Sequence, residues 1–307
     1  MTGTMNSEKD QTSKYRCGYV ALVGRPNVGK STLMNQVLGQ KLSIVTAKPQ
    51  TTRQRIAGIK TTPQGQIIYI DTPGIHLAAK SALNRYMNRI ARASFQDVDR
   101  ILFLIEAGRW TKEDEHVARA LQSVDVPLVL VVNKIDQVAD KSRLLSFLKN
   151  EVKTDRFEEV FLISAKRGDG VKSLEQNVLL SLPFSRPFYD EDMFTDRSER
   201  FLAAELVREQ LMVRLNQELP YALTVEIEEF KRETGLVRIG AIIWVERQGQ
   251  KQIVIGKGGS VLKQVGTQAR HALQELLDEK VYLRMFVKVS RDWSDNERAL
   301  KQFGYDD

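Results

Sequence analysis

The stretch GRPNVGKS, residues 24–31, decides the fold because it matches the pattern G-x-x-x-x-G-K-[ST] without a gap. An apolar run at 19–23 precedes it and a helical pattern follows it. Glycines let such a loop wrap around phosphates, so that backbone N–H groups and the positive end of the next helix point toward them. We therefore expect Lys30 to contact the β- and γ-phosphates of a nucleotide and Ser31 to bind Mg²⁺.

A second motif, Asp71-Thr72-Pro73-Gly74, follows the apolar run IIYI at 67–70. This position places a carboxylate at the carboxyl end of a strand, where α/β sheets bind ligands. We expect Asp71 to hold Mg²⁺ through water and the Gly74 N–H to sense the γ-phosphate.

Two further motifs point to the base. Asn133-Lys134-Ile135-Asp136 ends the run VPLVLVV, and Ser164-Ala165-Lys166 ends the next apolar run. The Asp136 carboxylate can accept hydrogen bonds from guanine N1–H and from the 2-amino group, whereas adenine offers neither donor in that arrangement. A site built on such bonds rejects the wrong base strongly, so Asp136 favours GTP over ATP. A backbone N–H at 164–166 can bind guanine O6.

Short apolar runs alternate with helical patterns through the first part of the chain. Strands are expected at 19–23, 67–70, 100–105, 127–132 and 159–163, and an amphipathic helix within 81–95. This alternation predicts βαβ units, and hence an α/β P-loop domain with a mostly parallel sheet and helices on both faces.

The order, spacing and strand-end placement of the four motifs resemble those of the Ras-like GTPases. The resemblance implies that Thr52, with Thr51 as the alternative, completes the Mg²⁺ shell in the GTP state. It also implies that Asn27 helps to bind K⁺ near the phosphates. Ile75 stands where many relatives have a glutamine that orients the attacking water, which isoleucine cannot do. We expect slow hydrolysis of GTP that K⁺ stimulates.

The expected site falls into three groups. The catalytic residues are Lys30, Thr52 and Gly74. The metal ligands are Ser31, Thr52 and Asp71 for Mg²⁺, and Asn27 for K⁺. The residues expected to bind GTP are Gly24, Arg25, Pro26, Asn27, Val28, Gly29, Lys30, Ser31, Thr32, Asp71, Thr72, Pro73, Gly74, Ile75, Asn133, Lys134, Ile135, Asp136, Ser164, Ala165 and Lys166.

The sequence pattern changes after residue 182. Two prolines, several acids and no periodicity predict a linker at 183–198 between a GTPase domain at 17–182 and a second domain at 199–307. In that domain a helix at 199–216, strands at 223–230 and 237–246, a glycine-rich turn, a helix ending near 278 and a strand at 281–289 give the order α-β-β-turn-α-β.

The glycine-rich turn contains G-x-x-G at 256–259. Around it, residues 247–274 carry five Lys or Arg and no acid, whereas 200–307 as a whole hold 17 basic and 16 acidic residues. This combination resembles a KH domain, in which such a loop lets a single-stranded nucleic-acid backbone approach closely. The alternative is a glycine turn before a helix with a solvated basic face. Ile255 and Val261 should flank the groove, and the expected RNA-binding residues are Ile255, Gly256, Lys257, Gly258, Gly259, Ser260 and Lys263.

Bulk properties constrain the partners. The 307 residues carry a net charge of +7, which suits an anionic partner. The single cysteine, Cys17, allows no intrachain disulfide and fits a reducing cytoplasm. Residues 1–16 are polar, lack an apolar signal region, and are expected to form a disordered arm. We expect a monomer that needs no organic cofactor.

Segments outside the generic motifs strengthen the picture. TDRSERFLAAELVRE at 195–209, IVIGKGGSVLK at 253–263 and DWSDNERALKQFGY at 292–305 resemble a family of bacterial GTPases of small-subunit ribosome assembly. The resemblance implies binding to the 3′ end of 16S ribosomal RNA, a role in maturation of the 30S subunit, and peripheral membrane contact. One alternative is an RNA-binding module with vestigial hydrolysis. Another, a GTPase that powers tRNA modification, would need a catalytic cysteine, a cofactor fold or a metal cluster, and Cys17 precedes the P-loop.

Overall fold

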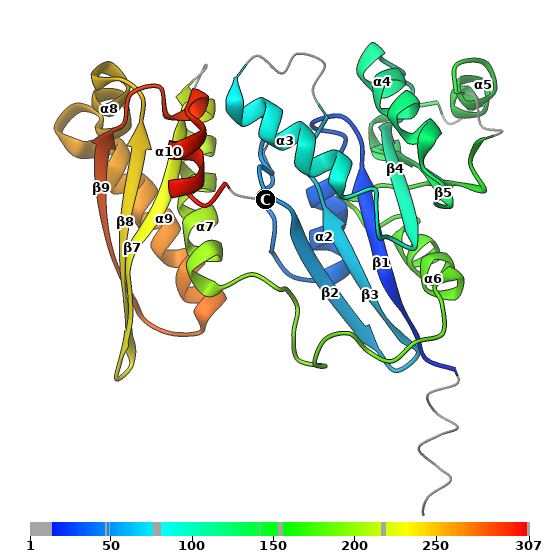
Figure 1. Ribbon diagram of the computed structural model, residues 1–307, viewed down its shortest axis with the longest axis horizontal. Helices are drawn as coiled ribbons and strands as arrows, with labels where there is room; N and C mark the ends of the chain where they lie inside the picture. Colours follow the sequence, from blue (N-terminus) through cyan, green and yellow to red (C-terminus); the bar gives the residue numbers. More distant parts are fainter. Residues whose placement is uncertain are drawn as a thin grey trace, which may run out of the picture. The chain divides into compact units, whose positions relative to one another are not determined.

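The structure is a computed structural model in which the chain forms two compact units, each described here by itself (Figure 1). The residues described are 14–46, 48, 50–75, 81–140, 142–152, 156–215 and 219–305. Most of the expected N-terminal arm, residues 1–13, therefore lies outside the described part. The first unit comprises Met1–Ser43, Thr52–Ala78 and Met87–Asp196, and the second comprises Ile44–Thr51, Ala79–Tyr86 and Arg197–Asp307.

The first unit is built on a six-stranded sheet with the order β2-β3-β1-β4-β5-β6. All neighbouring strands are parallel except β2 and β3, which are antiparallel. The strands are β1 (Arg16–Val23), β2 (Ile56–Thr62), β3 (Gly65–Asp71), β4 (Arg100–Glu106), β5 (Leu128–Asn133) and β6 (Glu159–Leu162). The prediction of a mostly parallel sheet is confirmed.

Strand β2 was not expected from the sequence. Its first four residues, 56–59, are all buried, so the strand lacks the alternation of buried and exposed positions that reveals a one-sided strand. Gly58 lies in the middle of it, and a Cβ there would come within 2.7 Å of the Leu38 side chain. Close packing against a helix, rather than β propensity, thus explains the glycine in this strand.

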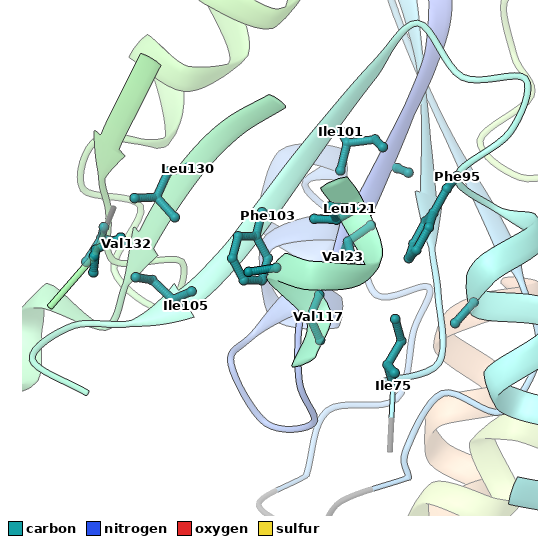
Figure 2. Packing of buried hydrophobic residues seen from close by; sticks show 14 of the residues in the cluster. Val23, Ile75, Phe95, Ile101, Phe103, Ile105, Val117, Leu121, Leu130 and Val132 are labelled. Carbon is teal, nitrogen blue, oxygen red and sulfur yellow. The ribbon is translucent and has the colours of Figure 1, made fainter. Parts of the chain in front are cut away.

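Helices cover both faces of this sheet, as predicted (Figure 1). They are α2 (Lys30–Leu38), α3 (Ala82–Ala93), α4 (Lys112–Ala120), α5 (Ser142–Asn150) and α6 (Val171–Ser181). Helix α2 contacts β2 and β3, and helix α6 contacts β1 and β3. On the other face Phe103 of β4 is fully buried near Val117 of α4 (Figure 2), and Phe147 of α5 belongs to the same apolar cluster. The resulting core fixes the strand ends from which the site loops leave.

Most of the stretch expected as a linker, residues 183–196, belongs to the first unit, and its last part lies along the edge strand β2. The backbone N–H of Ile59 donates to the carbonyl of Phe194 at 2.9 Å, and the Thr195 hydroxyl donates to the carbonyl of Ala57 at 2.7 Å. The buried Gln66 side chain accepts hydrogen bonds from the N–H groups of 188 and 189. The bonds to Ile59 and Ala57 cover backbone groups of β2 that an edge strand would otherwise expose, and those to the Gln66 side chain hold the segment against β3.

The second unit has a three-stranded sheet with the order β7-β8-β9. Strands β7 (Leu223–Glu233) and β8 (Leu236–Val245) are antiparallel, with an irregularity in the register between Ile227 and Glu229, and β8 is parallel to β9 (Val281–Val289). Two apolar clusters, which include Val207, Leu273 and Val287, pack one sheet face against the helices. The helices are α7 (Glu199–Arg214), α8 (Gln248–Ile255), α9 (Ser260–Leu277) and α10 (Glu297–Gln302).

The predicted element order of this unit was wrong at one point. The apolar stretch before G-x-x-G lies in a helix, α8, so the order is α-β-β-α-α-β. Helix α8 has eight residues, of which only Val254 is buried, so it shows almost no apolar periodicity. The tail adds α10. After this helix, the hydroxyl of Tyr305 lies 3.0 Å from the hydroxyl of Thr224 on β7. No helix in the described part of the chain is long and apolar enough to cross a membrane.

Candidate functional site

The loop at 24–29 connects β1 to α2 and depends on glycine at its end. Gly29 has φ 104°, a conformation that side chains other than glycine rarely adopt, and it caps the N-terminus of α2. A Cβ at this position would lie 2.2 Å from Nδ2 of Asn133. The glycine therefore permits close contact between this loop and the loop after β5.

Lys30 holds a positive charge at the start of α2. Its side chain is buried, and its ammonium donates to the carbonyls of Gly24 at 2.9 Å and Arg25 at 3.1 Å. Burial lowers its pKa to about 8, although the nearby Asp71 carboxylate opposes the shift. Two carbonyls leave most of the ammonium charge uncompensated, so the loop suits an anion such as phosphate.

Three oxygen-bearing side chains from distant parts of the sequence meet beside Lys30. The Ser31 hydroxyl donates to Oδ2 of Asp71 at 2.8 Å, Thr52 donates to the same atom at 3.1 Å, and the two hydroxyls are 3.0 Å apart. Asp71 is fully buried, and its Oδ1 has no hydrogen-bond partner within the described residues. Burial raises the pKa of Asp71, while Lys30 and the hydroxyls oppose that rise.

This cluster fits a hard divalent cation. A carboxylate and two hydroxyls supply the oxygen ligands that Mg²⁺ prefers, and the buried Oδ1 would gain a partner from bound cation or its water. The structure thus brings Ser31, Thr52 and Asp71 together as the sequence predicted. Thr51, the alternative to Thr52, does not belong to this hydrogen-bonded cluster.

The loop after β3 lies against the loop after β1. A Cβ on Gly74 would come within 2.8 Å of Pro26, and the Thr72 hydroxyl donates to the carbonyl of Leu22 at 2.9 Å. Ile75 is buried in the core of the first unit. The side chain at the position of the missing glutamine is therefore a packing residue.

Asn133 and Asp136 organise the far side of the site. Asn133 is buried, and its amide donates to the carbonyl of Val28 at 2.8 Å and accepts from the N–H of Ala165 at 2.9 Å. The Ser164 hydroxyl donates to Asp136 at 2.7 Å, and this bond is the main cause that lowers the pKa of Asp136. The hydroxyl of the 164–166 motif thus keeps the Asp136 carboxylate of the 133–136 motif ionised and in a fixed position.

The other residues predicted to bind nucleotide lie in the same loops. Thr32 is in the first turn of α2. Ile135 begins a short 3₁₀ helix just after β5, and Lys166 lies in the turn after β6. Asn27 has φ 64° and an exposed side chain.

The G-x-x-G loop of the second unit lies between α8 and α9. Gly256 has φ 75°, and a Cβ there would lie 2.5 Å from the Val261 side chain. Gly258 and Gly259 also have positive φ, but a Cβ on either would meet no atom within 4 Å. The loop surface is thus open at two of its glycines, which permits close approach of a polymer backbone.

The other predicted RNA-binding residues surround this loop. Lys257, Ser260 and Lys263 are exposed, and the last two line a hollow of about 370 Å³ together with Arg214 and three polar residues of α9. Ile255 and Val261 are partly buried against the core. A groove between Ile255 and Val261 stays a prediction.

Comparison with known proteins agrees with both halves of this description. A family model described as "50S ribosome-binding GTPase" matches residues 19–134, and a KH domain model matches residues 218–294. GTPase Era of Xylella fastidiosa (strain Temecula1 / ATCC 700964) is 53% identical over 296 residues, which cover 96% of this chain and 99% of that protein. The chain belongs to the Era family of GTPases. GTPase Era of Stenotrophomonas maltophilia (strain R551-3) gives the same identity and coverage.

Solved Era structures superpose on nearly the whole chain. A crystal structure of Era in complex with MgGDPNP and nucleotides 1506–1542 of 16S ribosomal RNA has a TM-score of 0.92 at 39% identity, with 95% of this chain and 99% of that chain covered. A single-residue variant of Aquifex aeolicus Era, bound to GDP.AlF4⁻, has a TM-score of 0.91 at 39% identity, covering 94% and 99%.

An ionic network in this Era-family chain was missed by the sequence reasoning. The buried Arg25 guanidinium donates to Glu106 at 2.7 Å and to Asp114 at 3.1 Å, and the Lys134 ammonium lies 3.4 Å from Glu106. Asp114 also completes the capping box at the N-terminus of α4 with Thr111. The available signals were a carboxylate at the end of a strand and the pattern T-x-x-D before a helix.

Proposed function

We propose that this chain is a GTP-dependent switch that binds the 3′ region of 16S ribosomal RNA through its KH domain during maturation of the 30S subunit. Its membership of the Era family makes it a GTPase. The observation that carries the proposal is the similarity, at a TM-score of 0.92, to Era in complex with MgGDPNP and nucleotides 1506–1542 of 16S ribosomal RNA. The open glycine loop beside exposed Lys257 supports it.

The proposed hydrolytic site uses the residues around the first loop. Ser31 and Thr52 would hold Mg²⁺ directly and Asp71 through water, and the bound cation would neutralise charge that develops on the phosphates. Lys30 would add a second positive charge, and the Gly74 N–H would contact the γ-phosphate. Asp136 and the backbone at Ala165 would select guanine. Because Ile75 is a packing residue, we infer that the intrinsic rate is slow.

We also propose that K⁺ stimulates hydrolysis through Asn27. The exposed asparagine lies in the phosphate-binding loop with positive φ, so its side chain is accessible from solvent. The test compares GTP turnover in K⁺ and in Na⁺ at equal ionic strength, for the native chain and for Asn27→Ala. A rate advantage in K⁺ that Asn27→Ala abolishes is expected, and equal native rates in the two salts would refute this part.

The rest of the proposal concerns location and assembly state. A buried, unpaired Cys17 supports a cytoplasmic protein. The expected monomeric state, and the peripheral membrane contact that the family resemblance implied, remain predictions.

The RNA assignment is tested by crosslinking the full chain to total cellular RNA, with a non-hydrolysable GTP analogue or with GDP. The control is the double variant Lys257→Asp/Gly258→Asp. Enrichment of the 16S 3′ region with the analogue, lost in the variant, is the expected outcome. Diffuse crosslinks that neither nucleotide nor variant changes would leave a GTPase whose second domain serves another partner.

A further inference from the structure

One face of the β7-β8-β9 sheet packs on the helices, and the opposite face carries aromatic and basic side chains on its last two strands. In the register of β8 and β9, Trp244 is opposite Lys288, and Arg238 is opposite Tyr282. Phe286 and Arg284 lie on the same face between them, because alternate residues of a strand share a face. The core-facing residues of β9 are instead Val281, Leu283, Met285 and Val287.

Each of the three rings has a cation beside it. Arg238 lies 5.4 Å from the ring centre of Tyr282, Arg284 lies 5.2 Å from that of Phe286, and Lys288 lies 5.6 Å from that of Trp244. Tyr282 is 51% exposed and Phe286 is 45% exposed. Such pairs fix a ring in place and leave a large part of it accessible.

Charge on this face is separated by strand. Strands β8 and β9 contain no acidic residue, whereas β7 carries the carboxylates. Arg238 and Arg284 each have one carboxylate neighbour on β7, Glu233 at 2.8 Å and Glu229 at 3.6 Å. The β8–β9 side of the face therefore presents cations and rings, and the carboxylates that reach it all come from β7.

Folding alone does not account for two exposed rings on an edge strand. Exposed apolar side chains on such a strand favour aggregation, and they typically mark an interaction surface. Trp244 is partly accounted for, because it contacts Phe303 of the tail and its indole N–H donates to Glu226. Among the aromatic residues packed in pairs or clusters in the described chain, neither Tyr282 nor Phe286 appears.

We propose that this face, defined by Arg238, Tyr282, Arg284, Phe286 and Lys288, is a second binding site for single-stranded RNA. Tyr282 and Phe286 stack on bases, and the three cations contact phosphates. Sheets with exposed aromatic residues bind single strands in this way, and every base offers a π face, so recognition tolerates sequence. The two rings are four residue steps apart on the strand, about 13 Å, so they contact bases that are not adjacent.

The proposal goes beyond the KH groove because the residues belong to a different element of the fold. The predicted groove residues lie in and around the G-x-x-G loop at 256–259, whereas this face lies on the sheet, on the side away from α7 and α9. RNA binding at this face requires no bound GTP and no specific RNA sequence. An acidic peptide would match the cations, but it would give the two rings no stacking partner.

The experiment measures binding of a fluorescein-labelled twelve-residue oligo(U) to the full chain by fluorescence anisotropy. Tyr282→Ala/Phe286→Ala is the test variant, and Leu145→Ala, which removes a 70% exposed apolar side chain from the first unit, is the matched control. We expect each lost ring to weaken binding by about fivefold or more, because base–aromatic stacking contributes about 1–3 kcal/mol. The conservative variants Tyr282→Phe and Phe286→Tyr should bind normally.

Two additions keep the outcome decisive. Tyr282→Leu/Phe286→Leu retains apolar bulk without a π face, so it replaces the alanine variant if that one unfolds, and it should also lose affinity. A photoreactive 5-iodouridine oligonucleotide should crosslink to the peptide that holds Tyr282 and Phe286, even in Lys257→Asp/Gly258→Asp. Native affinity in folded leucine or alanine variants, or crosslinks only to the G-x-x-G loop, would overturn the proposal. Failure of the 16S assignment would appear separately, as unchanged 16S binding by the Lys257/Gly258 variant.

Discussion

The guanidinium of Arg25 donates a 2.7 Å hydrogen bond to the carboxylate of Glu106, so the positive side chain of the phosphate-binding loop is neutralised from the end of β4. The same carboxylate oxygen lies 3.4 Å from the ammonium of Lys134, in the loop that precedes Asp136. One carboxylate therefore connects the loop predicted to bind phosphates to the loop predicted to bind the base. Because Arg25 is engaged in this way, Lys30 is the cation that we expect to contact the phosphates.

The first prediction concerns Glu106→Gln. Glutamine keeps the shape of the side chain but removes the charge, which leaves Arg25 with Asp114 alone and frees Lys134. Hydrogen bonds to charged groups contribute about 1.5–3 kcal/mol, so we expect the Kd for GTP and GDP to rise by about tenfold. Equilibrium titration with a fluorescent guanine nucleotide measures this Kd. Glu115→Gln is the control, because its carboxylate is in an exposed pair with Arg119. Equal Kd values for the two variants would contradict the positioning role.

The second prediction is the pH dependence of the same contact. Burial alone would raise the pKa of Glu106, but the hydrogen bond from Arg25 and the charges of Lys134 and Arg25 outweigh burial and lower it. The unfolded chain therefore binds a proton at a higher pH than the folded chain does. The stabilisation is present above the usual pKa of 4.5 and is lost as pH falls through the lower, folded-state pKa.

Glu106→Gln cannot take part in that titration. The difference in free energy of unfolding between the native chain and Glu106→Gln should thus be constant near neutral pH and shrink below about pH 4.5. Urea unfolding at a series of pH values measures the difference. Curves that stay parallel down to the acid transition would show that the contact is not coupled to the proton.

The contrast between predicted and missed residues has a physical basis. Lys30 and Asp136 were found because their motifs are contiguous and each follows an apolar strand. Glu106 and Asp114 were missed because a single carboxylate after a strand or in a capping box has many roles, and only the fold shows Arg25 between them. Strand β2 and helix α8 were missed for another reason. The first half of β2 is buried on both sides, and only Val254 of α8 is buried. Neither segment therefore shows the alternation of apolar and polar residues that reveals a strand or a helix.

The third prediction exchanges base specificity through Asp136→Asn. The aspartate carboxylate is predicted to accept hydrogen bonds from guanine N1–H and the 2-amino group, whereas an asparagine amide can donate to the 2-oxo group of xanthine. Affinity for GTP should fall by at least about tenfold, and XTP should become the better ligand. Competition between the two nucleotides measures the change. Ser164→Ala should cause a smaller loss without the exchange, because it removes only the hydroxyl that holds Asp136. Unchanged preference for GTP in Asp136→Asn would show that guanine is read elsewhere.

The last prediction compares two glycines that flank α2. Gly29 and Gly39 both have positive φ, at 104° and 69°, so alanine strains the backbone at either position by about 1 kcal/mol or more. They differ in their surroundings. A Cβ on Gly39 meets no atom within 4 Å, whereas one on Gly29 would lie 2.2 Å from Asn133 Nδ2 and would displace the amide that binds the carbonyl of Val28.

Gly39→Ala should therefore lower the urea midpoint but leave the Kd for GTP within about twofold of native, since it disturbs no contact of the site. Gly29→Ala should lower the midpoint and also raise that Kd by more than about tenfold, because the phosphate loop and the base loop lose their shared hydrogen bond. Nucleotide titration and urea unfolding on both variants separate the two effects. If Gly29→Ala bound GTP as well as Gly39→Ala, the Asn133–Val28 contact would be a stability feature with no part in nucleotide binding.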